Sequence, residues 1–280
     1  MKKTLIALAV AVFATSGTAI AALGAFSPSN TNNTITFGGS ITPDHQDYNV
    51  WTWAVGQGYE NFNNKISELT NDEKNLTITA NENMPLLVGK TLTPFEGTPG
   101  ISPQIEFLDS KGPLLIMWAN DNAEGSMTLT VNDTQQREIG SMTLNVTALA
   151  PVAWAKKDAS TGVSIRYLNN FSGSFIGSTG GFNSPPSFAQ VDDISTAFGA
   201  PSLAEMQRQL KSYPGLSNIA DDTTDLVAPS SNNYASVGWI YTGAYALGIR
   251  DGQSISITFA SPVTNETQWK APLMIQISYD

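Results

Sequence analysis

Short, strand-like apolar runs recur along most of this chain, and in several of them apolar side chains alternate with Ser or Thr. They cover residues 50–55, 76–79, 85–88, 105–108, 114–118, 127–131, 142–146, 235–249, 255–259 and 273–279. A period of two is typical of a strand with one buried face, and the Gly, Pro, Asn and Asp residues between the runs mark turns. This spacing predicts an all-β protein, and a β-sandwich rather than a parallel α/β sheet.

Residues 154–234 depart from that pattern, because they are rich in Gly, Ser, Phe and Asn and contain the best helical segment. Ser202 followed by Glu205 is a capping box. An apolar stripe then recurs at helical spacing, formed by Leu203, Met206, Leu210 and Tyr213. Asp192 and Asp193 are expected to cap a shorter helix over 194–198. We therefore expect an inserted subdomain with one or two short helices laid on the sandwich.

The first 21 residues have the form of an export signal. Lys2 and Lys3 precede the apolar run 4–14, and Ala19-Ile20-Ala21 is a small-x-small cleavage site. The run is shorter than the roughly 20 residues that span a bilayer. The pattern predicts a signal peptide over 1–21 with cleavage after Ala21, the alternative being an uncleaved anchor.

Charge and composition exclude several classes of function. The chain carries net −10, and without Lys2 and Lys3 the mature part has 12 basic and 24 acidic residues, or −12, so a nucleic-acid partner is not expected. The absence of Cys excludes a disulfide framework and a thiol nucleophile, and the single His45 lies in a polar, turn-like stretch. We expect no metal, no cofactor and no enzymatic activity. A free-standing secreted carbohydrate-binding domain or hydrolase is the competing interpretation.

The two ends of the mature chain carry complementary strand patterns. After the polar residues 22–34, the N-terminal extension presents one face made by Ile35, Phe37, Gly39 and Ile41. The C-terminal strand presents Leu273, Ile275, Ile277 and Tyr279 on one face. An amphipathic strand on a polar tail can fold back into its own domain, or it can be donated to a neighbour by β-augmentation.

Several segments resemble the FaeG-type fimbrial subunits of enterobacteria. The resemblance is carried by Gly38-Gly39-Ser40-Ile41-Thr42, 51–58, 76–79, 245–249 with Gly252-Gln253, and 268–273 running to the C-terminus. It spans nearly the whole mature chain, is specific at both ends, and is loose across 154–234.

The resemblance implies a chaperone–usher pilin, exported through the periplasm to a fimbrium on the cell surface. Its domain, here 42–280, would be an incomplete immunoglobulin-like sandwich that lacks its last strand. A periplasmic chaperone would cap the open groove, and at the outer-membrane usher the extension of a neighbouring pilin, residues 22–41, would replace it. Ile35, Phe37 and Ile41 would then fill the groove and Gly39 would pass its closest point. Leu273, Ile275, Ile277 and Tyr279 would border the groove and pair with the chaperone.

The same resemblance implies adhesion to a host glycoconjugate through the subdomain at 154–234. Sugars are bound by an aromatic face together with amide and charged groups, and this segment offers such a set. The candidate glycan-binding residues are Trp154, Lys156, Arg166, Tyr167, Asn169 and Phe171. A minor or purely structural pilin without receptor binding is the alternative.

Overall fold

The computed structural model describes residues 50–119, 123–157, 166–170, 187–220, 228–230 and 234–279, with backbone alone for 166–170 and 228–230. The strands of the first half are β1 (Trp51–Val55), β2 (Asn75–Thr79), β3 (Met84–Thr91), β4 (Phe95–Glu96), β5 (Pro103–Asp109), β6 (Gly112–Leu114), β7 (Met117–Trp118), β8 (Glu124–Asn132) and β9 (Glu138–Leu149). The second half adds β10 (Pro151–Lys156), β11 (Arg166–Asn170), β12 (Ala228–Ser230), β13 (Trp239–Ile249), β14 (Ser254–Phe259) and β15 (Met274–Tyr279). The helices are the 3₁₀ turn η1 (Ile66–Glu68), α1 (Phe188–Ala197) and α2 (Leu203–Lys211).

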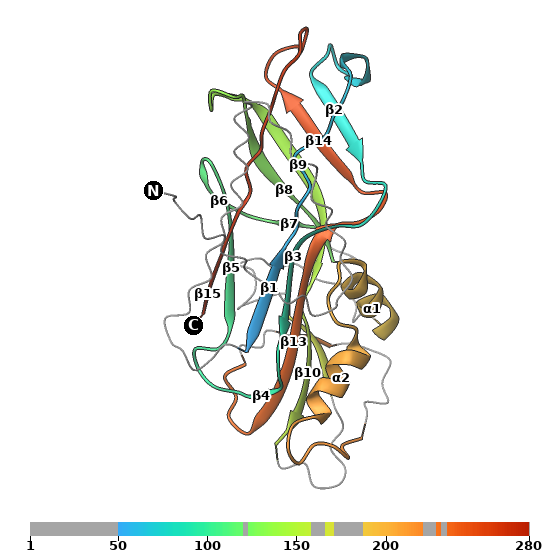
Figure 1. Cartoon of the computed structure of the whole chain (residues 1–280), viewed down its shortest axis with the longest axis vertical. Coiled ribbons are helices and arrows are strands. Elements are labelled where there is room, and N and C mark those ends of the chain that lie inside the picture. Colours follow the sequence, from blue (N-terminus) through green and yellow to red (C-terminus); the bar gives the residue numbers. More distant parts are fainter. Residues whose placement is uncertain are drawn as a thin grey trace, which may run out of the picture. The chain divides into compact units, whose positions relative to one another are not determined.

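Two sheets organise these strands (Figure 1). A twelve-stranded sheet follows the path β12-β11-β10-β13-β9-β14-β2, and β1, β3, β4, β7 and β8 attach to it. The second sheet has three strands in the order β15-β5-β6. All pairs of named strands are antiparallel except β11 with β12. The prediction of an all-β sandwich with a small helical insert is confirmed.

The alternation along β13 explains why the large sheet is covered on both faces. Tyr245, Leu247 and Ile249 belong to the core that also contains Ile105 and Phe107 of the small sheet. The small residues Ala244 and Ala246, at the intervening positions, belong to a second core that α1 and α2 complete. Small side chains on that face let the helices approach the sheet closely, so the layers run small sheet, large sheet, helices (Figure 1).

The second helix begins as its sequence predicts, and the first does not. Ser202 accepts a hydrogen bond from the backbone N–H of Glu205 and starts α2. The start expected at Asp192 is wrong, because Ser187 with Gln190 forms a complete capping box five residues earlier. Asp192 instead accepts a hydrogen bond from the backbone N–H of Leu203, so its carboxylate joins the two helices.

The pattern of the run 114–118 predicts one strand, and this prediction is wrong. Leu114 ends β6 in the small sheet, and Met117 belongs to β7 in the large sheet. Between them the chain crosses from one sheet to the other with Ile116 buried and Leu115 exposed. The apolar run therefore serves a crossing rather than a continuous ladder. No helix in the described ranges is long and apolar enough to cross a membrane.

Candidate functional site

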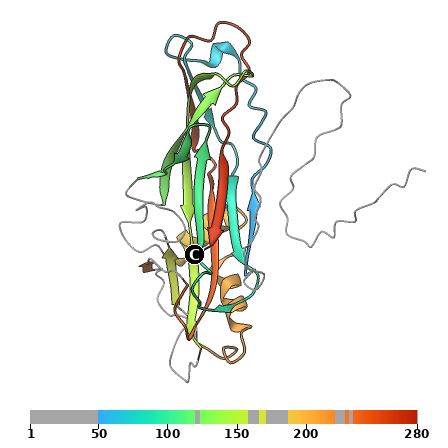
Figure 2. The same cartoon turned by 90° about the vertical axis from the view of Figure 1, so that its left-hand side faces the viewer.

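Two edge strands face each other on one side of the sandwich. Within the described residues, β1 pairs only with β3 and β15 only with β5. The Trp53 indole N–H donates to the Tyr279 hydroxyl at 2.9 Å, and the Phe62 and Trp269 rings stack with centroids 6.4 Å apart. Because Trp53 contacts Tyr279 and Phe62 contacts Trp269, the segments 51–62 and 269–279 run antiparallel (Figures 1 and 2). We call these two segments the edge seam.

The inward side chains of β15 are incompletely covered. Ile275, Ile277 and Tyr279 are half-buried, while the alternate residues Met274, Gln276 and Ser278 are exposed. Leu273, just before the strand, is buried. By contrast, Met127, Leu129 and Val131 of β8 face the same core and expose 1% or less of their surface. The edge seam therefore leaves apolar surface that the sandwich itself does not bury.

Trp53 reaches across the seam from a close-packed position. Its ring lies against Gly89 of β3, where an added Cβ would meet the ring at 2.2 Å, so no side chain fits there. The Trp51 ring stacks on the Trp53 ring, with centroids 5.6 Å apart. Burial raises the pKa of Tyr279, an effect that the Trp53 hydrogen bond partly offsets, so the phenol stays protonated at neutral pH while it accepts that bond.

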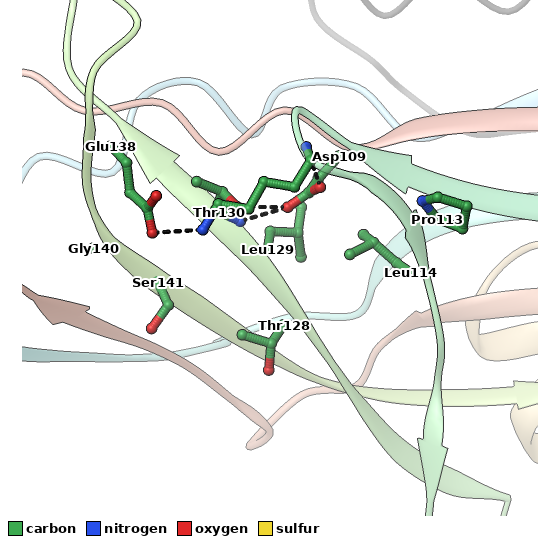
Figure 3. A pocket seen from close by; sticks show the side chains of 10 residues that line it. Asp109, Pro113, Leu114, Thr128, Leu129, Thr130, Glu138, Gly140 and Ser141 are labelled. Atoms are coloured by element: carbon green, nitrogen blue, oxygen red, sulfur yellow. Dashed lines mark hydrogen bonds and ion pairs between the residues drawn. The ribbon is translucent and has the colours of Figure 1, made fainter.

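The outer edge of the large sheet at β8 is closed. Asp109, at the end of β5, accepts hydrogen bonds from the backbone N–H and the hydroxyl of Thr130 on β8, at 2.9 and 2.8 Å (Figure 3). Asn132 exchanges backbone hydrogen bonds with Lys270. Side chains and a single bridge thus satisfy the outer N–H groups of β8 at these two positions, which protects that edge from a further strand.

A cavity of about 290 Å³ lies beside Asp109, between the β5–β6 hairpin and strands β8 and β9 (Figure 3). Its walls include Leu114, Thr128 and Ser141, together with Lys111 and Glu138, which form an ion pair at 2.7 Å. Within the described ranges, no group of three His, Cys, Asp or Glu side chains could hold a metal ion.

Asp109 makes the closed edge sensitive to acid. Burial raises its pKa, but the N–H groups of Lys111, Thr130 and Gly112 and the Thr130 hydroxyl outweigh this and hold it below the ordinary 3.8. A lowered folded-state pKa gives stability that is present above the unfolded-state value and is lost as pH falls through the folded one.

We expect Asp109→Asn to lower the free energy of unfolding by about 1.5–3 kcal/mol at neutral pH, since hydrogen bonds to a charged acceptor are lost. The deficit relative to the wild type should shrink below the unfolded-state pKa of about 4. Urea unfolding at several pH values measures both. Glu138→Gln, which breaks the exposed ion pair, should change stability by less than about 1 kcal/mol. A deficit that is the same at all pH values would contradict the assignment.

The structure describes part of the candidate glycan set. Strand pairing sets Trp154 of β10 opposite Arg166, Ala153 opposite Tyr167, and Pro151 opposite Asn169. Trp154 is half-buried, with the Trp239 ring at 4.3 Å and the Tyr241 ring stacked at 6.4 Å. Lys156, at the end of β10, is exposed. Phe171 lies outside the described residues.

The sequence prediction named one side of the edge seam and missed the other. Ile275, Ile277 and Tyr279 lie on it, whereas the donor positions Ile35, Phe37, Gly39 and Ile41 lie outside the described residues. Trp53, Tyr59 and Phe62 were not foreseen. Their spacings of six and three do not keep one period, because the chain after β1 leaves the ladder. The Tyr59 hydroxyl holds this stretch by donating to the Pro85 carbonyl.

Comparison with known proteins identifies the family of this chain. The family model described as "Fimbrial, major and minor subunit", of K88 type, matches residues 1–280. The K88 fimbrial proteins AC and AB of Escherichia coli are each 32% identical to this chain, with both chains covered in full. The F41 fimbrial protein of Escherichia coli is 25% identical over the same extent. These relatives are fimbrial proteins, not enzymes. The chain therefore belongs to the K88 family of fimbrial subunits, which makes it a pilus subunit of the cell surface that works in contact with other pilins.

Proposed function

We propose that this pilin polymerises by donor-strand exchange, with the edge seam as acceptor and residues 22–41 of a neighbour as donor. One observation carries the proposal: Ile275, Ile277 and Tyr279 stay half-buried beside an edge strand whose outer side makes no ladder in the described chain. The closed edge at Asp109 directs an incoming strand to the other side of the sandwich. The periplasmic chaperone and the outer-membrane usher are the further partners of this proposal.

Three contributions set the free energy of such a donation. Ile35, Phe37 and Ile41 would each contribute about 1.5–3 kcal/mol on burial. Each backbone hydrogen bond to an edge strand would add roughly 1 kcal/mol net. These gains are set against the entropy of ordering the segment, about 1–2 kcal/mol per residue. Full burial of the half-buried side chains of the edge seam would add a further favourable contribution from the acceptor.

Deletion of residues 22–41 from the mature chain should abolish self-polymerisation and leave the acceptor intact. Truncated subunits should remain monomeric in size-exclusion chromatography, yet bind a synthetic peptide of residues 30–42. The same peptide with Phe37→Asp is the matched control and should bind at least about tenfold more weakly, because it would bury a carboxylate. Fibres of normal yield from the truncated chain would refute the donor assignment.

We further propose that residues 154–234 form an inserted subdomain on the immunoglobulin-like domain 42–280, and that it attaches the fibre to host glycans. The support is local: β10 carries the half-buried Trp154 next to the exposed Lys156, with Trp239 against the Trp154 ring. A half-exposed ring beside charged groups suits the apolar face and hydroxyls of a sugar. The family assignment favours a pilin over a free-standing secreted hydrolase. A purely structural or minor pilin is the competing function.

Trp154→Ala, Arg166→Ala and Tyr167→Ala should each reduce binding of intact fibres to a glycan array by at least about tenfold, since each would remove a direct contact. Leu92→Ala, which removes an exposed side chain just after β3, is the control and should bind like the wild type. Electron microscopy of each variant confirms that fibres still form. Unchanged binding in all three variants would favour the structural pilin.

A further inference from the structure

We propose that the extension of a free subunit occupies that subunit's own edge seam, so that the monomer is self-closed until the same segment passes to a neighbour. This inference rests on the acceptor role proposed for the seam. The inference adds a self-closed monomer, whose extension must leave its own seam before the subunit can polymerise. The occupant is the segment 35–41 of the same chain, and three features support it: where the chain enters the seam, how long the segment is, and how close it is tethered.

The chain enters the seam at the correct end. Trp53 of β1 is hydrogen-bonded to Tyr279, so the start of β1 lies at the C-terminal end of β15. The described chain therefore begins, at Val50, near the Tyr279 end of β15. Residues 42–50 separate Ile41 from β1, and hairpin loops need only about 2–5 residues. Pro43 and Asp44 are residues that favour a turn at this place.

The segment and the seam match in length and pattern. Residues 35–41 and residues 273–279 each number seven. After a turn through 42–50, the segment would run antiparallel to β1 and parallel to β15. Ile41 would then be level with Tyr279, Phe37 with Ile275, and Ile35 with Leu273. Each of these would place an apolar side chain over the incompletely buried face of β15.

Tethering favours the self-closed state over donation at ordinary concentrations. A short flexible connector gives a local concentration in the millimolar range. Free subunits below that concentration would close on themselves before they meet a partner. The same segment fills the seam in the self-closed monomer and in the fibre. The fibre is therefore more stable than self-closed monomers only through further contacts between subunits. Polymerisation would therefore begin slowly and require release of the segment.

Cysteine cross-linking tests this directly, because the chain contains no Cys of its own. The mature chain with Phe37→Cys and Ile275→Cys is oxidised at micromolar concentration and run on non-reducing gels. We expect an intrachain cross-link in the monomer. The matched control pairs Phe37→Cys with Met274→Cys, whose exposed side chain lies on the other face of the strand. It should cross-link at least about fivefold less, since alternate residues point to opposite faces.

A second pair of variants separates self-closure from donation. Residues 44–49 are replaced by six prolines, or by a Gly/Ser sequence of equal length. Polyproline is a stiff, extended spacer that cannot reverse direction over so few residues, whereas Gly/Ser can. In the Phe37→Cys, Ile275→Cys background, the proline connector should reduce the intrachain product at least about fivefold and leave interchain products. It should also shorten the lag of polymerisation.

The outcomes differ for the inference and for the proposed function. Interchain products alone, with either connector, would overturn self-closure and support donation between subunits. An intrachain product that persists with the proline connector would also overturn self-closure as described. No product above the Met274 control, within or between chains, would overturn both. An intrachain product that depends on a flexible connector supports the inference.

Discussion

Ile277→Asp should stop this pilin from accepting a strand while leaving its ability to donate one. Ile277 is half-buried on the inward face of β15 and would be covered by the donor. A carboxylate buried there without a partner costs about 3 kcal/mol or more, which corresponds to a loss of over about a hundredfold in complex formation. Binding of a 30–42 peptide to chains that lack residues 22–41, with and without the substitution, followed by fluorescence anisotropy, measures the loss.

The chain offers two controls for this substitution. Gln276→Asp places the same group on the exposed face of the same strand and should change peptide affinity by less than about twofold. In a mixture, the Ile277→Asp chain can donate but not accept, and the chain lacking residues 22–41 can accept but not donate. The mixture should stop at heterodimers in size-exclusion chromatography. Long fibres from the mixture would show that polymerisation does not use the edge seam.

Leu247→Ala should produce the largest loss of stability. Leu247 lies near the C-terminal end of β13 and is fully buried, with β3 and β9 paired on its two sides. Large-to-small substitution at such a site costs about 2–5 kcal/mol, because apolar burial is lost and a cavity remains. For a domain of this size, each kcal/mol lowers Tm by about 2–4 °C. Thermal unfolding of the monomer followed by circular dichroism checks the prediction.

Leu115→Ala makes the same chemical change at an exposed position. Leu115 keeps 67% of its surface accessible, so the free energy of unfolding should move by less than about 0.5 kcal/mol. Equal losses in the two variants would mean that β13 is not the centre of the core. Peptide binding at the edge seam should survive Leu115→Ala, since that residue lies at the crossing from the small to the large sheet.

Local sequence patterns predicted the strands whose buried and exposed side chains alternate regularly. The alternation in 127–131, 142–146 and 255–259 corresponds to β8, β9 and β14. Ser202 with Glu205 located α2, because a capping box is formed by residues three apart. The prediction was wrong at 114–118, where an apolar run crosses between sheets. It was also wrong at Asp192, where a second capping box begins the helix five residues earlier.

The candidate site was half predictable for a related reason. The alternation over 273–279 identifies which side chains of the last strand point inward. It does not reveal that they stay half-buried, since that depends on what packs over them. Trp53 and Tyr279 are 226 residues apart in the chain, and no pattern in either segment pairs them.

What the sequence by itself determined is therefore local: which residues form strands, where α2 begins, and that both ends carry one apolar face. Only the tertiary structure decided which edge of the sandwich is closed and which has no further strand among the described residues. Strand order and the contacts of Asp109 with Thr130, and of Trp53 with Tyr279, join segments far apart in the chain. The physical reason is that a period of two shows which face a strand buries, while the cover over that face is supplied by distant parts of the chain.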